Sequence, residues 1–192
     1  SVSFEWHRCF LIPRSMKHVS RFVSLVCTWN HPSARECGPV SDPIIPSRMH
    51  LFWAGGPPGS QELACLRLAR HFHPDWSITV HSEDVSVERQ ALLHLANVTP
   101  LDWLDCDMRR FYDQASSSAM RSDVVRYAAL KRWGGVWLDF DVVCLRPLDK
   151  LRGYAGFAGS ESFGLIGSSV IGAMPESPVI RRALDLILEW FD

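Results

Sequence analysis

Two aspartates, Asp139 and Asp141, stand one residue apart directly after the apolar run Val136-Trp137-Leu138. Side chains of an extended chain alternate from face to face, so both carboxylates are expected on one side, where they share one cation. Such hard oxygen ligands suit Mn²⁺ or Mg²⁺, which complete their shells with water and the phosphate oxygens of a substrate. A cation here would neutralise the charge that develops on a departing diphosphate. We therefore predict that Asp139 and Asp141 are metal-binding and catalytic residues.

A second pair of charged residues, Asp123 and Arg126, lies upstream on a segment with the period of a helix, residues 116–133. Residues three apart share one face of a helix. Gly134-Gly135 is predicted to end this helix, because glycine accepts the left-handed conformation of a helix C-cap. Two interpretations of the pair stay open, since it forms either an intrahelical salt bridge worth roughly 0.3–0.5 kcal/mol or part of the aspartate site. The two interpretations are compatible.

The order of elements around these residues predicts an α/β fold. A buried strand at Met49–Trp53 leads through a glycine-rich loop, residues 54–59, to a helix at 61–71 and a strand at 77–81. This order indicates a parallel pair of strands, whose ligands bind beyond the carboxyl ends. The sequence further predicts helices over residues 85–96, 101–112 and 177–190, and strands over residues 136–138, 142–145, 155–159 and 165–173.

The composition is that of a packed globular domain. The chain has 192 residues, of which 47% are hydrophobic and 21% charged. A net charge of −1 offers no bulk attraction to nucleic acid, so any phosphate must be held by a local site. The six cysteines include no C-x-x-C pair, which argues against a zinc or thioredoxin-like site. We expect a small-molecule partner and no nucleic acid.

The first part of the chain, residues 1–42, is rich in Arg, Ser and His and shows no sustained period. It predicts a poorly ordered extension before a domain at residues 43–192, with a targeting segment as the alternative. No run approaches the roughly 20 apolar residues that span a bilayer, so any membrane anchor is expected outside this chain. Asn97-Val98-Thr99 fits the N-glycosylation sequon, which is a weak indication of a luminal compartment.

Two separated blocks of residues carry a family resemblance. They comprise Ile45 to Gly56 with Pro74-Asp75-Trp76, and Ser122 to Tyr127 with Leu130, Trp133 to Asp141 and Leu145 to Leu148. In this order the blocks resemble family 32 of the glycosyltransferases, those with the DXD sugar-binding region, and the large clostridial glucosylating toxins share a similar signature. The similarity covers about residues 43–180. Two blocks in the right order are far more specific than either block alone.

This resemblance implies a GT-A fold, which is a Rossmann-like sheet that binds a nucleotide sugar and is flanked by helices. The donor would be a UDP- or GDP-hexose. Mn²⁺ or Mg²⁺ would bind at Asp139 and Asp141, with Asp141 the more direct ligand. The transferred hexose would contact Asp123, Arg126 and Asp139.

The resemblance also implies that the nucleoside lies beside Phe52, Trp53 and Ala54. An aromatic face against a base is worth roughly 1–3 kcal/mol in single-strand binders. Packing in the hydrophobic core is the alternative role for Trp53, and both stay open.

Further consequences of the resemblance concern the reaction. The acceptor would be a hydroxyl of a glycan, a lipid or a protein, the anomeric configuration would be retained, and a eukaryotic chain with an upstream anchor would act in the Golgi lumen. Relatives often carry an asparagine within the segment 166–173, where this chain has Ser168 and Ser169. Relatives also continue well beyond a helix such as residues 177–190, so the domain is expected to be truncated at its C-terminus.

Two alternatives to an active transferase remain. One is a degenerate domain that binds a nucleotide sugar without turning it over. The other is a phosphatase of the haloacid dehalogenase type, in which D-x-D supplies a nucleophile and an acid/base. That motif normally follows the first strand of its domain, whereas Asp139 lies late in this chain.

Overall fold

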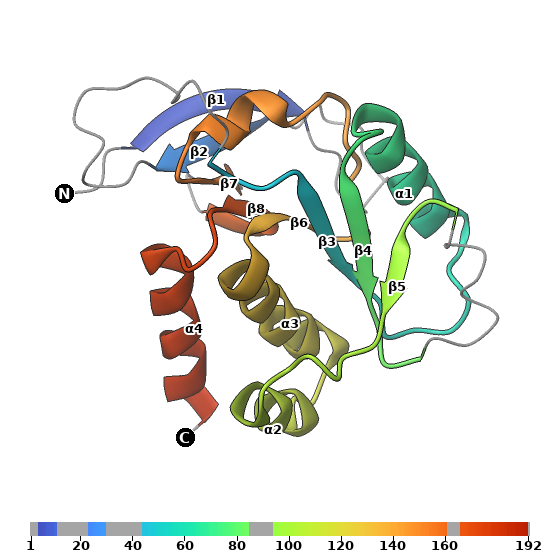
Figure 1. The fold of residues 1–192 in the computed structure, drawn as a ribbon, viewed down its shortest axis with the longest axis vertical. Coiled ribbons are helices and arrows are strands. Elements are labelled where there is room, and N and C mark those ends of the chain that lie inside the picture. Colours follow the sequence, from blue (N-terminus) through green and yellow to red (C-terminus); the bar gives the residue numbers. More distant parts are fainter. Residues whose placement is uncertain (1–3, 11–22, 30–43, 85–93, 161–165, 192) are drawn as a thin grey trace.

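One mixed sheet runs through the molecule, with helices packed on both of its faces (Figure 1). The computed structural model describes residues 4–10, 23–29, 44–84, 94–160 and 166–191. The elements in chain order are β1 (Phe4–Phe10), β2 (Val23–Trp29), β3 (Arg48–Phe52), α1 (Ser60–Phe72), β4 (Ser77–His81), β5 (Asn97–Thr99), α2 (Cys106–Gln114), α3 (Ser118–Trp133), β6 (Gly135–Leu138), a 3₁₀ turn (Asp149–Gly153), β7 (Gly156–Ser160), β8 (Ile166–Ala173) and α4 (Pro178–Phe191).

The sheet has the strand order β1-β2-β7-β8-β6-β3-β4-β5. Strands β6, β3, β4 and β5 run parallel to one another, whereas β8, β7, β2 and β1 add successive antiparallel pairings beyond β6. In the parallel pair β3–β6, His50 lies opposite Trp137. Continuing this register brings Asp139 level with Phe52, so the ends of two distant segments meet at one edge.

Side-chain alternation along the central strands divides the core between the two faces of the sheet. Val136 and Leu138 of β6 join the core on the α1 side, together with Cys65 and Leu66 of that helix. Trp137 points to the opposite face, where helices α2, α3 and α4 pack in a second core. Helix α3 therefore lies directly over the strand that leads to the two aspartates.

Helix α3 has a defined start and end. The Ser117 hydroxyl accepts a hydrogen bond from the Met120 backbone N–H at 3.2 Å, which satisfies one of the free donors of the first turn. Gly134 and Gly135 end the helix with φ values of +60° and +98°, a region that side chains with a Cβ rarely occupy. A Cβ on Gly135 would also lie 2.6 Å from the Arg48 carbonyl oxygen. The glycine pair thus lets α3 turn directly into β6.

Two buried histidines lie beneath the C-terminal end of α3. His50 contacts the Gly134 carbonyl oxygen through Nε2 at 3.1 Å, and its Nδ1 lies 3.0 Å from His81 Nε2. The Trp133 ring stacks on both histidines at centroid distances of 5.7 and 5.8 Å. Burial lowers the pKa of His50 to about 4 and that of His81 to about 3. Both rings are therefore neutral at physiological pH.

Most of the predicted elements are confirmed, including the parallel pair β3–β4 and the boundary between α3 and β6. The strand predicted over residues 142–145 is wrong, because the chain leaves β6 in a turn and then runs irregularly. The helix predicted over residues 101–112 begins later, at Cys106, where the Asp105 carboxylate caps its first turn. Strand β5 was not predicted.

Two sequence predictions concern segments that the structure describes in part. Residues 85–93 of the predicted helix 85–96 lie outside the described residues, and residues 94–96 form a turn. Within the predicted extension 1–42, β1 and β2 pair with each other, and β2 joins the sheet through β7. The remaining residues of that segment lie outside the described part, and the domain boundary near residue 42 stays a prediction.

Candidate donor-binding site

A pocket of about 580 Å³ opens at the carboxyl ends of β3 and β6. This volume falls within the range of roughly 300–1,000 Å³ that small-molecule sites occupy. The pocket collects every site residue predicted from the sequence, together with several that were not, and its described lining is Phe52, Trp53, Ala54, Gly55, Ser118, Ala119, Ser122, Asp123, Arg126, Asp139, Phe140, Asp141 and Ser168. Segments far apart in the sequence therefore form one site.

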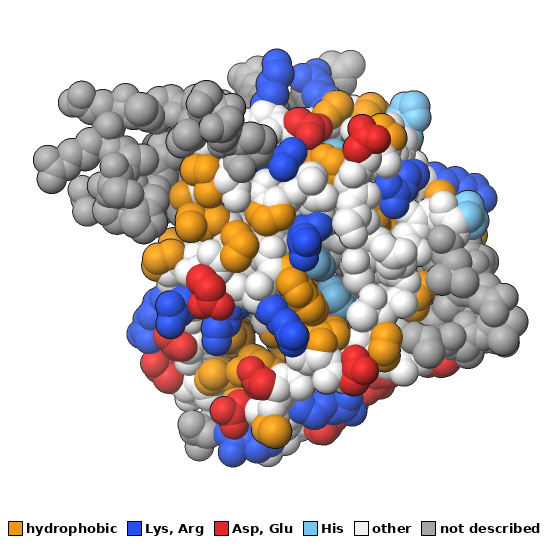
Figure 2. All heavy atoms as spheres, in the orientation of Figure 1, with side chains coloured by type: hydrophobic (Ala, Val, Ile, Leu, Met, Phe, Trp, Pro, Cys, Tyr) orange, Lys and Arg blue, Asp and Glu red, His pale blue; other side chains and the backbone are white. Residues whose placement is uncertain are grey.

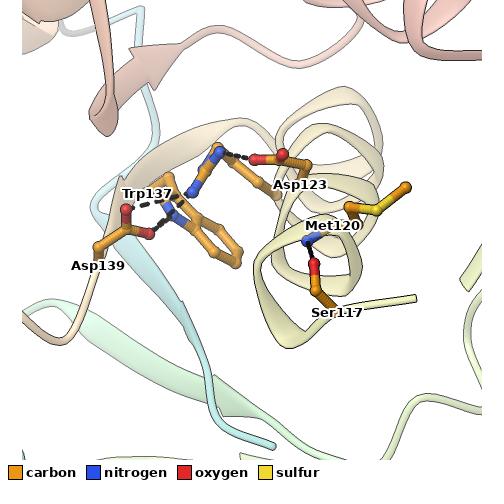
Figure 3. Close-up of polar contacts among 6 residues, drawn as sticks. Ser117, Met120, Asp123, Trp137 and Asp139 are labelled. Atoms are coloured by element: carbon orange, nitrogen blue, oxygen red, sulfur yellow. Dashed lines mark hydrogen bonds and ion pairs between the residues drawn. The ribbon is translucent and has the colours of Figure 1, made fainter. Parts of the chain in front are cut away.

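Arg126 is the central cation of the pocket and is 3% exposed. Its guanidinium forms a salt bridge with Asp123 on the same helix and donates to both oxygens of Asp139 at 3.0 and 3.2 Å (Figure 3). The helix pair predicted from the sequence thus exists and also reaches the first aspartate of D-x-D. Arg126 Nε is buried and has no hydrogen-bond partner among the described residues. A ligand oxygen at this donor would recover part of its desolvation cost.

The Asp139 carboxylate has its orientation fixed by three hydrogen bonds from two side chains, Arg126 and Trp137. Besides the two bonds from Arg126, Oδ1 accepts from Trp137 Nε1 at 2.6 Å, and the Asp139 backbone N–H donates to the Ser169 carbonyl at 2.9 Å. A carboxylate that accepts several charged or well-aligned donors is held in one rotamer. Asp139 is therefore a fixed anion on the wall of the pocket.

Asp141 differs from Asp139 in both backbone and partners. The Val142 N–H donates to the Asp139 carbonyl at 3.1 Å, so the D-x-D residues form a tight turn instead of the extended chain assumed from the sequence. Within the described ranges, the Asp141 side chain makes no hydrogen bond or ion pair. The two aspartates still line the same pocket, although the period-two argument that predicted this was wrong.

The free carboxylate of Asp141 fits a divalent cation, because Mg²⁺ and Mn²⁺ need one or two protein carboxylates and take their other ligands from water and phosphate. Among the residues that the structure describes, no group of three or more His, Cys, Asp or Glu side chains forms a complete metal cage. In such an arrangement Asp141 would supply a carboxylate ligand, and water or phosphate oxygens would supply the others.

The loop after β3 forms the wall across from helix α3. Trp53 donates from its indole Nε1 to the Gly56 carbonyl at 2.7 Å, and its carbonyl accepts from the Ser82 hydroxyl at 2.7 Å. Phe140, the middle residue of D-x-D, packs edge-on against the Trp53 ring at a centroid distance of 5.3 Å. Trp53 is half-buried, so it belongs to the core and to the pocket wall at once.

Several residues of the site were missed by sequence reasoning. Trp137 and Phe140 were assigned only to a strand and to the middle of the motif, and hydrophobic periodicity could not indicate their partners. Ser118, Ser122 and Ser168 bring hydroxyl groups to the pocket from α3 and β8. Ser122 lies within the family signature, and Ser168 lies in the segment where relatives often carry an asparagine, so a signal existed for both, whereas Ser118 carries no local pattern that distinguishes it.

Charged side chains are spread over the surface, and ion pairs occur both at the pocket and away from it. Figure 2 shows acidic and basic side chains interspersed over α2, α3 and α4, in keeping with the net charge of −1. The charged side chains that line the pocket are Arg126, Asp123, Asp139 and Asp141. No helix of the described part is long and apolar enough to cross a membrane.

The fold is that of glycosyltransferase domains of the GT-A type. The structure superimposes on "PaToxG Glycosyltransferase" with a TM-score of 0.63 over 77% of this chain and 61% of that chain, at 15% identity. A UDP-bound glycosyltransferase domain from the YGT toxin gives a TM-score of 0.57 over 78% of this chain and 63% of that chain, at 10% identity. At these identities the likeness concerns the fold. D-x-D follows β6, which comes after five other strands in the chain, whereas the dehalogenase-type motif normally follows the first strand of its domain; this order favours the glycosyltransferase over the phosphatase.

Residues 59–158 match the family described as "Glycosyltransferase sugar-binding region containing DXD motif", and the chain belongs to this family. "Inositol phosphoceramide mannosyltransferase 3" of Schizosaccharomyces pombe is 27% identical over 140 residues, which are 73% of this chain and 36% of that protein. "Mannosyl phosphorylinositol ceramide synthase SUR1" of Saccharomyces cerevisiae is 36% identical over 64 residues, 33% of this chain and 17% of that protein. The chain thus spans about a third or less of the length of these curated relatives.

Proposed function

We propose that this chain binds a nucleoside diphosphate hexose and transfers the hexose to a hydroxyl group of an acceptor. The observation that carries the proposal is the single pocket that joins the β3 loop, the Asp123–Arg126 face of α3 and the D-x-D turn. An aromatic wall, a fixed cation with two carboxylates and a free carboxylate suit the three parts of such a donor, namely base, hexose and diphosphate.

The hexose contacts are assigned to Asp123, Arg126 and Asp139. One guanidinium faces two carboxylates, so the group keeps a net charge of −1 and offers charged donors and acceptors to the neutral hydroxyls of a sugar, which it binds by charge-assisted hydrogen bonds. Because Arg126 is buried and held from two sides, it is preorganised before the donor arrives. Such preorganisation lowers the cost of orienting the sugar at the moment of transfer.

The diphosphate is assigned to Asp141 and a divalent cation, for which Mn²⁺ and Mg²⁺ are the candidates. The bound cation would neutralise the charge on the leaving nucleoside diphosphate. Asp141 suits this role because its carboxylate has no partner among the described residues. Asp139 takes the supporting role, since both of its oxygens already accept from Arg126.

The nucleoside is assigned to the wall formed by Phe52, Trp53 and Ala54. The half-buried Trp53 ring packs against Phe140, and its N–H is bonded to the Gly56 carbonyl. The ring is therefore already held in place, and a base that stacks on it restricts little further side-chain motion. UDP and GDP sugars are both included in the proposal.

The acceptor is assigned to a glycan or lipid hydroxyl, in line with the names of the fungal relatives, and mannose is the first hexose to test. By resemblance, we assign retention of the anomeric configuration, which NMR of the product checks directly. For a eukaryotic source we assign the Golgi lumen. Asn97 is exposed in the sequon on β5, so loss of mass on glycan removal from the native protein would report luminal passage.

The proposal is tested by donor turnover with purified chain, UDP- and GDP-hexoses, and Mn²⁺, Mg²⁺ or chelator. We expect hydrolysis or transfer with one donor, loss of activity with chelator, and a roughly 100- to 1,000-fold lower kcat for Asp141→Asn. Asp102→Asn is the matched control, because Asp102 is exposed outside the pocket lining. Equal turnover by wild type and Asp141→Asn would contradict the metal assignment.

A domain that binds the donor without turning it over is the second candidate. Calorimetry separates the two. Saturable donor binding with no product in the same buffer would assign this chain to binding alone, whereas product formation excludes that role.

A further inference from the structure

Trp137 lies beneath the pocket. It contacts Asp139 and Arg126, which line the pocket, but does not itself line the space that a donor would fill. The residue is in the centre of β6 and is fully buried on the α3 side of the sheet. It does not belong to the pocket lining. Its indole Nε1 nevertheless donates to Asp139 Oδ1 at 2.6 Å (Figure 3). The one polar atom of a core tryptophan thus forms a hydrogen bond with a residue that lines the pocket.

The same indole ring also supports Arg126. The guanidinium carbon lies 5.2 Å from the centroid of the Trp137 ring, within the range of a cation–π contact. Asp139 Oδ1 therefore accepts from Trp137 and Arg126 together, while Arg126 rests on the ring of its co-donor. Each of the three side chains therefore contacts the other two, so a shift of any one of them disturbs two contacts.

The rigidity of Trp137 comes from its place in the sheet. β6 pairs with β3 on one side and β8 on the other, with Trp137 opposite His50 and Ile171. A large buried ring with neighbours on both sides has one rotamer. The direction of its N–H is therefore fixed by the core and not by the ligand.

We propose that Trp137 is a positioning residue, which orients Asp139 and Arg126 toward the donor hexose through its N–H and its ring face. The inference rests on the proposed function. Trp137 acts through Asp139 and not on the substrate, so its loss affects the hexose more than the nucleotide.

The first test compares Trp137→Phe with Trp133→Phe. Phenylalanine keeps an aromatic face under Arg126 but lacks the donor, and Trp133 is a matched tryptophan that contacts the histidine pair away from Asp139. We expect Trp137→Phe to lower kcat/KM for the donor by roughly 10- to 100-fold, in proportion to a lost bond to a charged group. UDP or GDP affinity should change less than threefold in both variants.

A double-mutant cycle decides whether the effect passes through Asp139. In the Asp139→Asn background, Trp137→Phe should lower kcat/KM by less than threefold, because the carboxylate it orients is gone. A merely structural role of Trp137 would give the same fold-change in both backgrounds. Equal fold-changes, or an unchanged kcat/KM in the wild-type background, would overturn the proposal.

An isosteric replacement covers the case in which Trp137→Phe does not fold. Benzothienylalanine at position 137 keeps the size of the ring system and replaces the N–H by sulfur, and the same loss of kcat/KM is expected from it. Indole ¹⁵N–¹H spectra supply an independent readout, since the Trp137 signal should move in Asp139→Asn while the Trp133 signal does not. A wild-type chain inert toward every donor would overturn the proposed function as well, whereas an active wild type with an additive cycle would overturn the role of Trp137 alone.

Discussion

Polar side chains are buried at two places along helix α3. They are charged at one place and neutral at the other. The part of α3 that lines the pocket, residues 118–126, is called the charged end below, and there Arg126 is buried as a cation between Asp123 and Asp139. At its C-terminal end, His50 and His81 are buried with a backbone carbonyl and with each other, and they lack an acidic partner among the described contacts. The first end is charged and opens to a pocket, and the second is neutral and closed.

The difference follows from the cost of burying charge. A buried cation is tolerated only where carboxylates supply the interactions that water has lost. A histidine without such a partner gives up its proton instead, which is why burial lowers the pKa of both His50 and His81. The charged end is thus suited to a polar ligand, and the neutral end to holding α3 against β3 and β4.

The largest effect is expected from removing the cation at the charged end. Arg126→Met leaves Asp139 and Asp123 without their shared partner, so we expect about 3 kcal/mol lower unfolding free energy and at least a 100-fold lower kcat/KM. Asp139 is 26% exposed, which keeps the stability loss at the lower end of the range for buried pairs. Urea denaturation and donor kinetics measure the two effects.

Arg132→Met is the matched control for this prediction. Arg132 lies on the same helix, is exposed and donates to the Trp103 carbonyl outside the donor pocket. A change below about 0.5–1 kcal/mol is expected for an exposed side chain of this kind. Similar losses in the two variants would contradict the special status of the charged end.

The two neutral histidines should make the stability of the fold depend on pH. As the pH falls below about 6.5, the unfolded chain protonates its histidines while His50 and His81 in the folded protein stay neutral, so stability decreases. Each histidine contributes up to about 1.4 kcal/mol per pH unit, until the pH reaches its folded pKa of about 4 or 3. Urea midpoints between pH 7 and 5 measure this slope before the carboxylates titrate.

A variant with His50→Leu and His81→Leu tests the source of that slope. It should retain a shallower dependence, because burial also lowers the pKa of His73 and that residue still titrates. If the slope is as steep as in the wild type, the histidine pair is not the cause.

The smallest expected effect concerns the cap that starts the charged end. Ser117→Ala removes the hydroxyl that accepts from the Met120 N–H, and a loss of about 1 kcal/mol in unfolding free energy is expected. Ser116→Ala serves as the control, since the Ser116 hydroxyl contacts the Met120 sulfur and caps no backbone donor. Calorimetric melting of both variants compares them, and equal melting temperatures would argue against the cap.

The sequence by itself determined the features that depend on near neighbours along the chain. Helix α3, its glycine end and the following strand are visible because periodicity and glycine conformation are local properties. The family resemblance also named the pocket residues before their positions were known, and the structure brings them together. Their individual roles remain predictions.

The resemblance implied that Asp141 is the more direct metal ligand, but only the tertiary structure decided which contacts distinguish the two aspartates. The turn at Asp139 gives one carboxylate to Arg126 and Trp137 and leaves the other free among the described residues. No local pattern contains this, because it depends on which strand lies beside β6 and which helix lies over it. The same holds for Phe140 against Trp53, a contact between segments that meet only when the parallel sheet forms. Pairing and burial are set by packing, and packing is the part of the structure that spacing along the chain does not encode.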